Sequence, residues 1–262
     1  MKNKSIAVFD SGVGGLTVYE KLKSILPKEN YIYFGDLKNS PYGQKSKEQL
    51  IEITSYIFDY FKKKDVKAVV MACNTTSANV YDVYKDSFDY KIYPIIQTCA
   101  KVISELPIKK LGVFATSATI ESGAYKREIN KYNKNIEVFE MSCPGWVQIV
   151  EENKQNDKEN IKFIKSKLDE MLDKKPDKII LGCTHYPFLL DVLSQFAPRE
   201  MFIDPSEFFA KYIKKDLEKA DLLNENGGEE LFSVSANPKE FKIAAKMFYE
   251  LKELPIVVDC EN

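Results

Sequence analysis

The chain has 262 residues, of which 44% are hydrophobic and 29% are charged, an ordinary composition for a soluble protein with a hydrophobic core. The 38 basic and 39 acidic residues nearly cancel, which argues against a nucleic-acid-binding surface and against an acidic tail. The length fits two domains or one large domain.

The compartment can be predicted from what the sequence contains. No apolar run is long enough for the core of a secretory signal or for a membrane-spanning helix. Cysteines are odd in number and widely spaced, which is typical of reduced thiols and not of a disulfide framework: Cys73, Cys99, Cys143, Cys183 and Cys260. We therefore expect a cytoplasmic protein.

Short apolar runs alternate with amphipathic stretches along the first third of the chain. We expect strands at 5–9, 30–35 and 68–72, and helices at 16–26 and 46–63. Strands that alternate with helices in this way indicate an α/β fold with a mainly parallel sheet.

The same pattern recurs further along the chain. Residues 111–117 resemble 6–12, and residues 179–184 resemble 69–74. The offsets of about 105 and about 110 residues are too long for a solenoid unit and indicate a domain duplication. Any two α/β halves look alike at their strands, but here the polar residues after the strands match as well.

The duplication predicts two similar α/β domains. We expect residues 1–93 with 208–262 to form the first, and residues 94–207 to form the second. Ligands of open α/β sheets bind outside the carboxyl ends of the strands. If the two domains face each other, both sets of strand ends line one shared cleft.

Cys73 and Cys183 end equivalent strands of the two halves. A single buried cysteine at a strand end is usually a small hydrophobic residue. Here two cysteines occupy equivalent positions, and each is followed by polar residues and a predicted helix N-terminus. This arrangement favours a catalytic role for both. Such a terminus stabilises a thiolate and also binds a carboxylate.

Two similar groups on opposite sides of one carbon are what racemisation requires. One group removes the Cα proton while the other delivers a proton to the opposite face, and the roles exchange in the reverse direction. Asp10 ends the first strand and is the predicted partner of Cys73. His185, the only histidine, is the predicted partner of Cys183 or of a substrate carboxylate, although a lone histidine is more often structural.

Hydroxyl and amide side chains cluster at the strand ends of both halves. Only two basic residues are arginines, so backbone N–H groups and hydroxyls are the expected carboxylate binders. The cluster comprises Ser11, Asn74, Thr75, Thr76, Thr116, Thr119 and Thr184. Turn chemistry explains any one of them, but their clustering favours an anion-binding cleft. Tyr42-Gly43 is either a loop that closes over this cleft or a plain turn.

At these motifs the sequence resembles the glutamate racemases of the aspartate/glutamate racemase superfamily. The similarity extends from about residue 6 to about residue 210 and includes both cysteine motifs in order. The matching segments are 9–17, 35–43, 72–75, 116–125 and 181–187.

The resemblance implies a homodimeric enzyme that interconverts L- and D-glutamate without a cofactor and supplies D-glutamate for peptidoglycan. It implies that Cys183 abstracts the Cα proton of the L-isomer and Cys73 that of the D-isomer. Family substrate contacts correspond to Asp10, Ser11, Tyr42, Gly43, Asn74, Thr75, Thr184 and His185, and Thr116 and Thr119 belong to a further matching segment.

The family pattern also has an acidic residue after a Cys-Pro pair. Its counterpart here is Glu151, which follows Cys143-Pro144, with Glu152 next to it. The intervening residues 145–150 depart from the family pattern, as does the segment 97–99. The choice between the two glutamates therefore stays open.

Other interpretations compete with this one. The glycines at 12–15 suggest a dinucleotide site, but Thr17 stands where the fingerprint needs a third glycine. A second alternative is a hydrolase or transferase with Cys183 as nucleophile and His185 as base, but this mechanism gives Cys73 no catalytic role. We expect no metal site, because 183–185 offers only two ligands. Within the superfamily, an aspartate racemase or another two-cysteine racemase is the nearest alternative.

Overall fold

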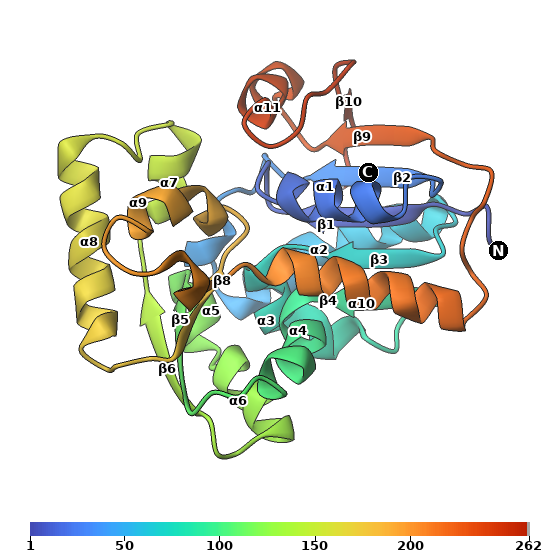
Figure 1. Ribbon diagram of the computed structural model, residues 1–262. Coiled ribbons are helices and arrows are strands. Elements are labelled where there is room, and N and C mark those ends of the chain that lie inside the picture. Colours follow the sequence, from blue (N-terminus) through green and yellow to red (C-terminus); the bar gives the residue numbers. More distant parts are fainter. Residues whose placement is uncertain (261–262) are drawn as a thin grey trace.

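All strand pairs in the described part of the chain are parallel. The computed structural model describes residues 1–260 and contains two separate sheets connected by helices (Figure 1). The predicted fold class, two duplicated α/β units with mainly parallel sheets, is confirmed.

The first sheet has six strands, and its centre is fully buried. β1 lies between β2 and β3, with Phe9 next to Met71 and Asp10 next to Gly35. The sequences of such strands are continuous apolar runs, because helices cover both faces of a parallel sheet. The strand order is β10 (Ile256–Val257), β9 (Glu230–Val234), β2 (Tyr31–Gly35), β1 (Ile6–Asp10), β3 (Ala68–Met71) and β4 (Lys91–Pro94).

Helices lie on both faces of this sheet. Ala7 and Phe9 of β1 pack into one apolar cluster and Ile6 and Val8 into another, as alternating residues of a strand must. A capping box at Ser46 fixes the start of the second helix. The helices of this half are α1 (Leu16–Ile25), η1 (Tyr42–Gln44), α2 (Lys47–Lys63) and α3 (Asn74–Tyr84).

The second sheet repeats the first in its connectivity. Its order is β6 (Glu137–Ser142), β5 (Lys110–Ala115), β7 (Lys178–Gly182) and β8 (Phe202–Ile203), so β5 to β8 have the same neighbours as β1 to β4. Its helices are α5 (Ser117–Glu121), α6 (Ala124–Tyr132), α7 (Trp146–Glu151), α8 (Lys158–Leu172), η2 (Tyr186–Leu189), α9 (Leu190–Leu193) and η3 (Arg199–Met201). The matched strand pairs identified in the sequence therefore occupy equivalent central positions.

Two helices join the halves. α4 (Ile95–Ser104) packs against α6 and α10, and α10 (Pro205–Lys219) packs against α1 and α4. After α10 the chain adds β9 and β10 to the first sheet, with α11 (Pro238–Ala245) between them. The division into domains at 93/94 and 207/208 stays a prediction, although the strands change sheet near these residues.

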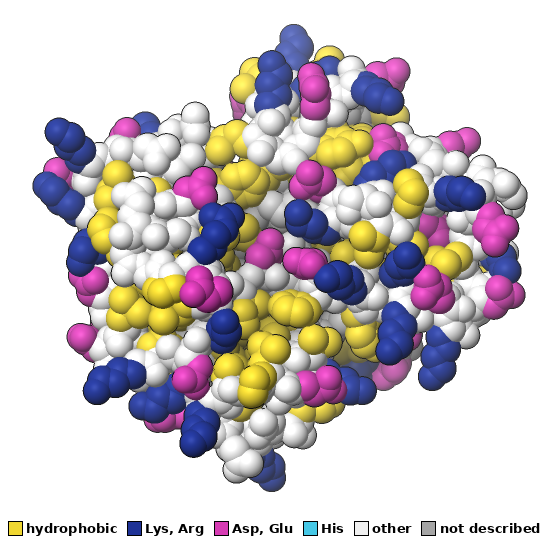
Figure 2. Space-filling view, viewed as in Figure 1, with side chains coloured by type: hydrophobic (Ala, Val, Ile, Leu, Met, Phe, Trp, Pro, Cys, Tyr) yellow, Lys and Arg dark blue, Asp and Glu magenta, His cyan; other side chains and the backbone are white. Residues whose placement is uncertain are grey.

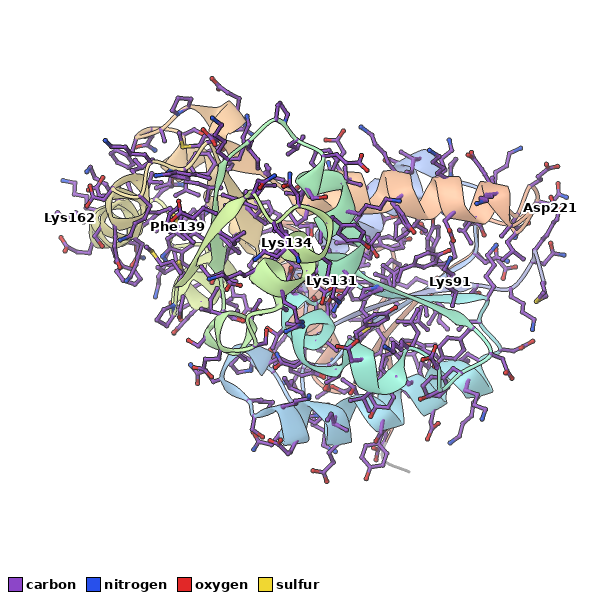
Figure 3. All side chains as sticks on the ribbon, turned by 90° about the horizontal axis from the view of Figure 1, so that it is seen from below. Lys91, Lys131, Lys134, Phe139, Lys162 and Asp221 are labelled. Atoms are coloured by element: carbon purple, nitrogen blue, oxygen red, sulfur yellow. The ribbon has the colours of Figure 1, made fainter. Side chains whose placement is uncertain are left out.

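The molecule is elongated along the line that joins the two halves. Seen from below, Lys162 of α8 and Asp221 after α10 lie at opposite ends (Figure 3). Basic and acidic side chains are mixed over the face drawn in Figure 2, with apolar side chains between them. Among the described residues, no helix has the length and apolar character needed to span a membrane.

Candidate active site

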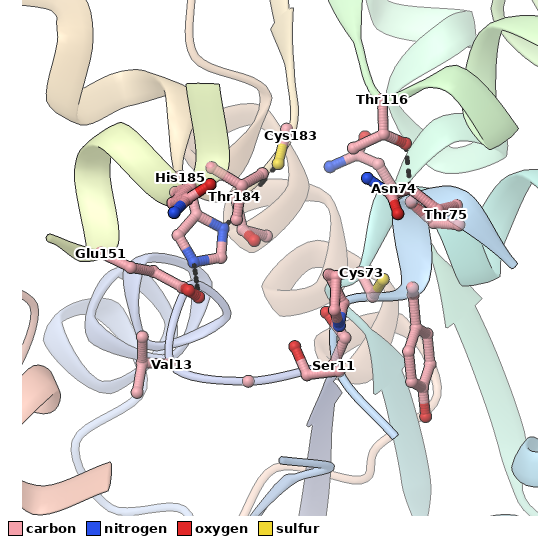
Figure 4. A pocket seen from close by; sticks show the side chains of 18 of the residues that line it. Ser11, Val13, Cys73, Asn74, Thr75, Thr116, Glu151, Cys183, Thr184 and His185 are labelled. Atoms are coloured by element: carbon pink, nitrogen blue, oxygen red, sulfur yellow. Dashed lines mark hydrogen bonds and ion pairs between the residues drawn. The ribbon is translucent and has the colours of Figure 1, made fainter. Parts of the chain in front are cut away.

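A cavity of about 550 Å³ brings most of the predicted site residues together. Residues after β1, β3, β5 and β7 contribute to its lining, so strand ends of both sheets face one space (Figure 4). The predicted residues that line it are Ser11, Tyr42, Gly43, Cys73, Asn74, Thr75, Thr116, Glu151, Cys183, Thr184 and His185.

The two thiols enter the cavity from different sheets. Cys73 follows β3 and Cys183 follows β7, and they are 5% and 8% exposed. Figure 4 shows them on different walls of the pocket. Because the two strands are equivalent in the repeat, the duplication supplies one thiol from each half.

The helix termini expected after the cysteines differ. Cys73 is the N-cap residue of α3, as predicted. After Cys183, in contrast, a short 3-10 turn begins at Tyr186 and contains Pro187 near its start. The expectation of an equivalent helix N-terminus at Cys183 is therefore wrong, because the chain turns at Thr184 and His185 first.

A side-chain imidazole stands beside Cys183 instead of a helix terminus. His185 Nδ1 is 3.8 Å from Cys183 Sγ, and His185 Nε2 is 3.0 Å from Glu151 Oε1. Burial lowers the pKa of His185, but the contacts with Cys183 and Glu151 outweigh it and raise that pKa to about 10. These contacts therefore favour the charged form of the imidazole, which faces Cys183 on one side and Glu151 on the other.

The orientation of α7 distinguishes the two candidate glutamates. Glu151 lines the cavity and contacts His185. Glu152 does not line the cavity and accepts hydrogen bonds from Gln148 and Lys154 instead. Of the two, Glu151 is therefore the residue in contact with the site.

Asp10 lies behind the cavity wall and does not line the cavity. It is fully buried and accepts hydrogen bonds from the Gly12 N–H (3.0 Å) and from Thr184 Oγ1 (3.4 Å). Burial raises the pKa of Asp10. Burial, followed by the negative charge of Asp10, raises the pKa of Cys73 to about 12, so Cys73 holds its proton at neutral pH.

A chain of threonine hydroxyls crosses between the halves. Thr75 Oγ1 and Thr116 Oγ1 share a hydrogen bond of 2.9 Å, and Thr116 Oγ1 and Thr119 Oγ1 share one of 3.0 Å. Thr119, expected at the substrate, does not line the cavity and supports Thr116 and Thr75 from behind. Gly43 packs here too, because an added Cβ would lie 2.9 Å from Thr116 Cβ.

Tyr42 is bonded within the first half, whereas the Gly12–Gly15 loop packs against the second half. Tyr42 is 1% exposed, and its hydroxyl donates to Asp36. An added Cβ at Gly14 would lie 2.4 Å from Thr184 Oγ1 and 2.5 Å from His185 Cε1. The glycines therefore let this loop of the first half approach the Cys183 motif of the second.

Asn74 offers an unused hydrogen-bond donor at the cavity. Its Oδ1 accepts from the Tyr125 hydroxyl at 2.7 Å. Its Nδ2 is buried and has no hydrogen-bond partner among the described residues. Because buried polar groups are nearly always hydrogen-bonded, this donor is available to an acceptor in the cavity.

The charge of the lining is unusual for an anion site. No lysine or arginine belongs to the cavity lining formed by the described residues, whereas Glu151 and Glu240 do. Hydroxyls, amides and the start of α3 are therefore the available binders of a carboxylate. The described residues contain no group of three or more His, Cys, Asp or Glu arranged to hold a metal ion.

One wall of the cavity was absent from the sequence-based prediction. Asn237, Glu240, Phe241 and Ala244, at the start of α11 and within it, line the cavity. Phe241 packs so closely on β2 that an added Cβ at Gly35 would lie 2.8 Å from its Cε2. These residues lie outside both the repeat and the matched motifs, so no sequence pattern indicates that they line the cavity.

The fold and the site define a duplicated α/β protein whose two halves share one cavity and each contribute one thiol to it. The chain belongs to the Asp/Glu/hydantoin racemase family, whose model matches residues 6–213. It is 38% identical over 266 residues to glutamate racemase 2 of Caldanaerobacter subterraneus subsp. tengcongensis, with 100% of each chain covered.

Further comparisons agree. The chain is 36% identical to the glutamate racemase of Carboxydothermus hydrogenoformans, covering 93% of this chain and 91% of that one. The crystal structure of glutamate racemase from Francisella tularensis subsp. tularensis in complex with D-glutamate superposes with a TM-score of 0.93 and 34% identity over 100% of both chains. The predicted family is therefore confirmed.

Proposed function

We propose that this chain interconverts L- and D-glutamate by a two-base mechanism in which Cys73 and Cys183 exchange roles. The observation that carries the proposal is the pair of thiols, one from each half of a duplicated fold, in one cavity. The relatives named as glutamate racemases, one of them in complex with D-glutamate, support glutamate as the substrate.

In the direction from L to D, the Cys183 thiolate removes the Cα proton, and the Cys73 thiol delivers its own proton to the opposite face. The negative charge thereby moves from one sulfur to the other, and the reverse reaction returns it. His185, held by Glu151, is the partner of Cys183, and Asp10 is the partner of Cys73. Proton transfer by positioned groups of this kind accelerates reactions by roughly 10²–10⁴-fold.

The substrate carboxylates would be bound by neutral donors. Asn74 Nδ2 has no protein partner, and the first N–H groups of α3 are free of helical bonds. The hydroxyls of Ser11, Thr75, Thr116 and Thr184 line the same cavity, together with Tyr42 and Gly43. No step in this mechanism needs a cofactor or a metal.

The test is to incubate each glutamate enantiomer with the enzyme in D₂O. The product should carry deuterium at Cα, and Cys73→Ser and Cys183→Ser should each lower kcat by at least about 100-fold. Cys99→Ala is the matched control, since Cys99 is buried but does not line the cavity. Absence of exchange at Cα in the unmodified enzyme would refute the proposal.

A second function has one observation in its favour. The contacts from Cys183 through His185 to Glu151 are those of a nucleophile, a base and an orienting group. In a hydrolase or transferase of that kind, Cys73→Ser would stay active, and a covalent adduct would form on Cys183. Within the racemases, comparing kcat/KM for glutamate and aspartate tests the choice of substrate.

We further propose that the enzyme is a cytoplasmic homodimer that supplies D-glutamate for peptidoglycan. The family resemblance supports this proposal. Sedimentation velocity should give twice the mass of the 30.1 kDa chain. A species of monomer mass at micromolar concentration would contradict the dimer without affecting the proposed chemistry.

A further inference from the structure

Residues 122–125 match the family pattern, yet none of them belongs to the cavity lining. Tyr125 is the second residue of α6, which begins after Gly123 in a left-handed conformation (φ 60°). Its side chain is fully buried. A buried polar side chain at this position needs a role that direct contact with the substrate does not provide.

The hydroxyl of Tyr125 reaches across to the first half of the molecule. It donates to Asn74 Oδ1 at 2.7 Å, and Asn74 is the residue that follows Cys73. Because the amide oxygen accepts this bond, the amide nitrogen must face the other way. That nitrogen is the buried donor without a partner, and Asn74 lines the cavity.

The ring of Tyr125 packs on the other cysteine segment. An added Cβ at Gly182 would lie 2.9 Å from Tyr125 Cε2, and Gly182 directly precedes Cys183. One buried side chain therefore contacts the residue after the first thiol and the residue before the second.

From this double contact we infer that Tyr125 is a positioning residue, which orients the Asn74 amide toward the substrate and sets the spacing of the two cysteine segments. The inference rests on the proposed function and deepens it. The Tyr125 hydroxyl orients the Asn74 amide, and the Tyr125 ring sets the spacing of the two cysteine segments. The two contributions can therefore be separated by mutation.

Tyr125→Phe keeps the ring and removes only the hydroxyl. We expect KM for both glutamate enantiomers to rise about tenfold with a smaller change in kcat, because the freed amide can present its oxygen to a carboxylate. Tyr31→Phe is the matched control, since Tyr31 is 1% exposed and its hydroxyl donates to the Leu26 carbonyl, away from the cavity. That variant should keep the KM of the unmodified enzyme.

A double-mutant cycle separates positioning from general loss of structure. In the Asn74→Ala background, Tyr125→Phe should have no further effect on KM, because the group through which it acts is missing. A full additional tenfold effect there would overturn the inference, as would an unchanged KM in Tyr125→Phe alone.

A readout independent of activity completes the test. The side-chain amide NMR signals of Asn74, identified by their loss in Asn74→Ala, should shift in Tyr125→Phe and stay in place in Tyr31→Phe. Unchanged signals in Tyr125→Phe would refute the inference even in an active enzyme. Conversely, shifted signals in a protein that exchanges no Cα proton would uphold the contact and refute only the proposed function.

Discussion

The two cysteines are equivalent in the repeat but have different electrostatic surroundings. The pKa of Cys73 is raised to about 12, first by burial and then by the negative charge of the buried Asp10. Cys183 faces His185, which is held by Glu151. At neutral pH Cys73 therefore holds its proton, whereas Cys183 has a basic side chain as its neighbour.

Removal of the Glu151 carboxylate should change the pH dependence. Glu151→Gln deletes one of the contacts that raise the pKa of His185 to about 10, so this pKa should fall. The imidazole then loses its charge at lower pH, and the alkaline limb of kcat should move to lower pH. At neutral pH kcat should drop roughly tenfold or more.

The measurement is the pH profile of kcat in the L-to-D direction. Glu152→Gln is the matched control, because it changes the neighbouring carboxylate, which contacts Gln148 and Lys154 and not His185. An alkaline limb that is unchanged in Glu151→Gln, or equally shifted in Glu152→Gln, would contradict the assignment.

The sequence predicts those helices and strands whose positions follow from a local pattern of apolar and polar residues. The strands that precede Cys73 and Cys183 are apolar runs with polar ends, and the structure confirms both. The choice of Glu151 over Glu152 depends on the rotation of α7, which starts after Gly145 in a left-handed conformation (φ 89°). No local pattern encodes that rotation, nor the return of α11 to the cavity from the far end of the chain.

Helix α11 forms a wall of the cavity and can be tested separately. Phe241 is fully buried on Gly35, whereas Ile243 on the same helix is 69% exposed. Phe241→Ala should cost about 3 kcal/mol of unfolding free energy through the cavity that it leaves, and should raise KM for glutamate. Ile243→Ala should change neither quantity in urea unfolding and steady-state assays. Equal effects of the two changes would show that α11 does not contribute to the site through Phe241.

A buried ion pair connects segments that are distant in the sequence. It lies at the end of the first sheet that faces away from the cavity. Lys67 Nζ is 2.5 Å from Glu29 Oε2, with both side chains 1% exposed. Lys67 also donates to the carbonyls of Lys2 and Leu222, and Glu29 accepts from the Asn224 N–H. The cluster thus joins the N-terminus, two strands and the segment that follows α10.

Breaking one side of this pair should be more costly than removing both charges. Glu29→Gln leaves the Lys67 ammonium buried without its partner and should cost about 3–5 kcal/mol of unfolding free energy. The double variant with Lys67→Met should recover part of that loss. Glu159→Gln, which breaks the exposed pair with Lys162, should leave stability almost unchanged. Racemisation should persist in every variant that folds, since none of these residues lines the cavity.

The unequal partners of the two thiols have a thermodynamic consequence. L- and D-glutamate are mirror images and have equal free energy in water, so no catalyst can favour one of them at equilibrium. The Asp10 side and the His185 side can nevertheless bind and process the two enantiomers differently. Turnover number and half-saturation concentration are therefore free to differ between the two directions, but they must differ by the same factor.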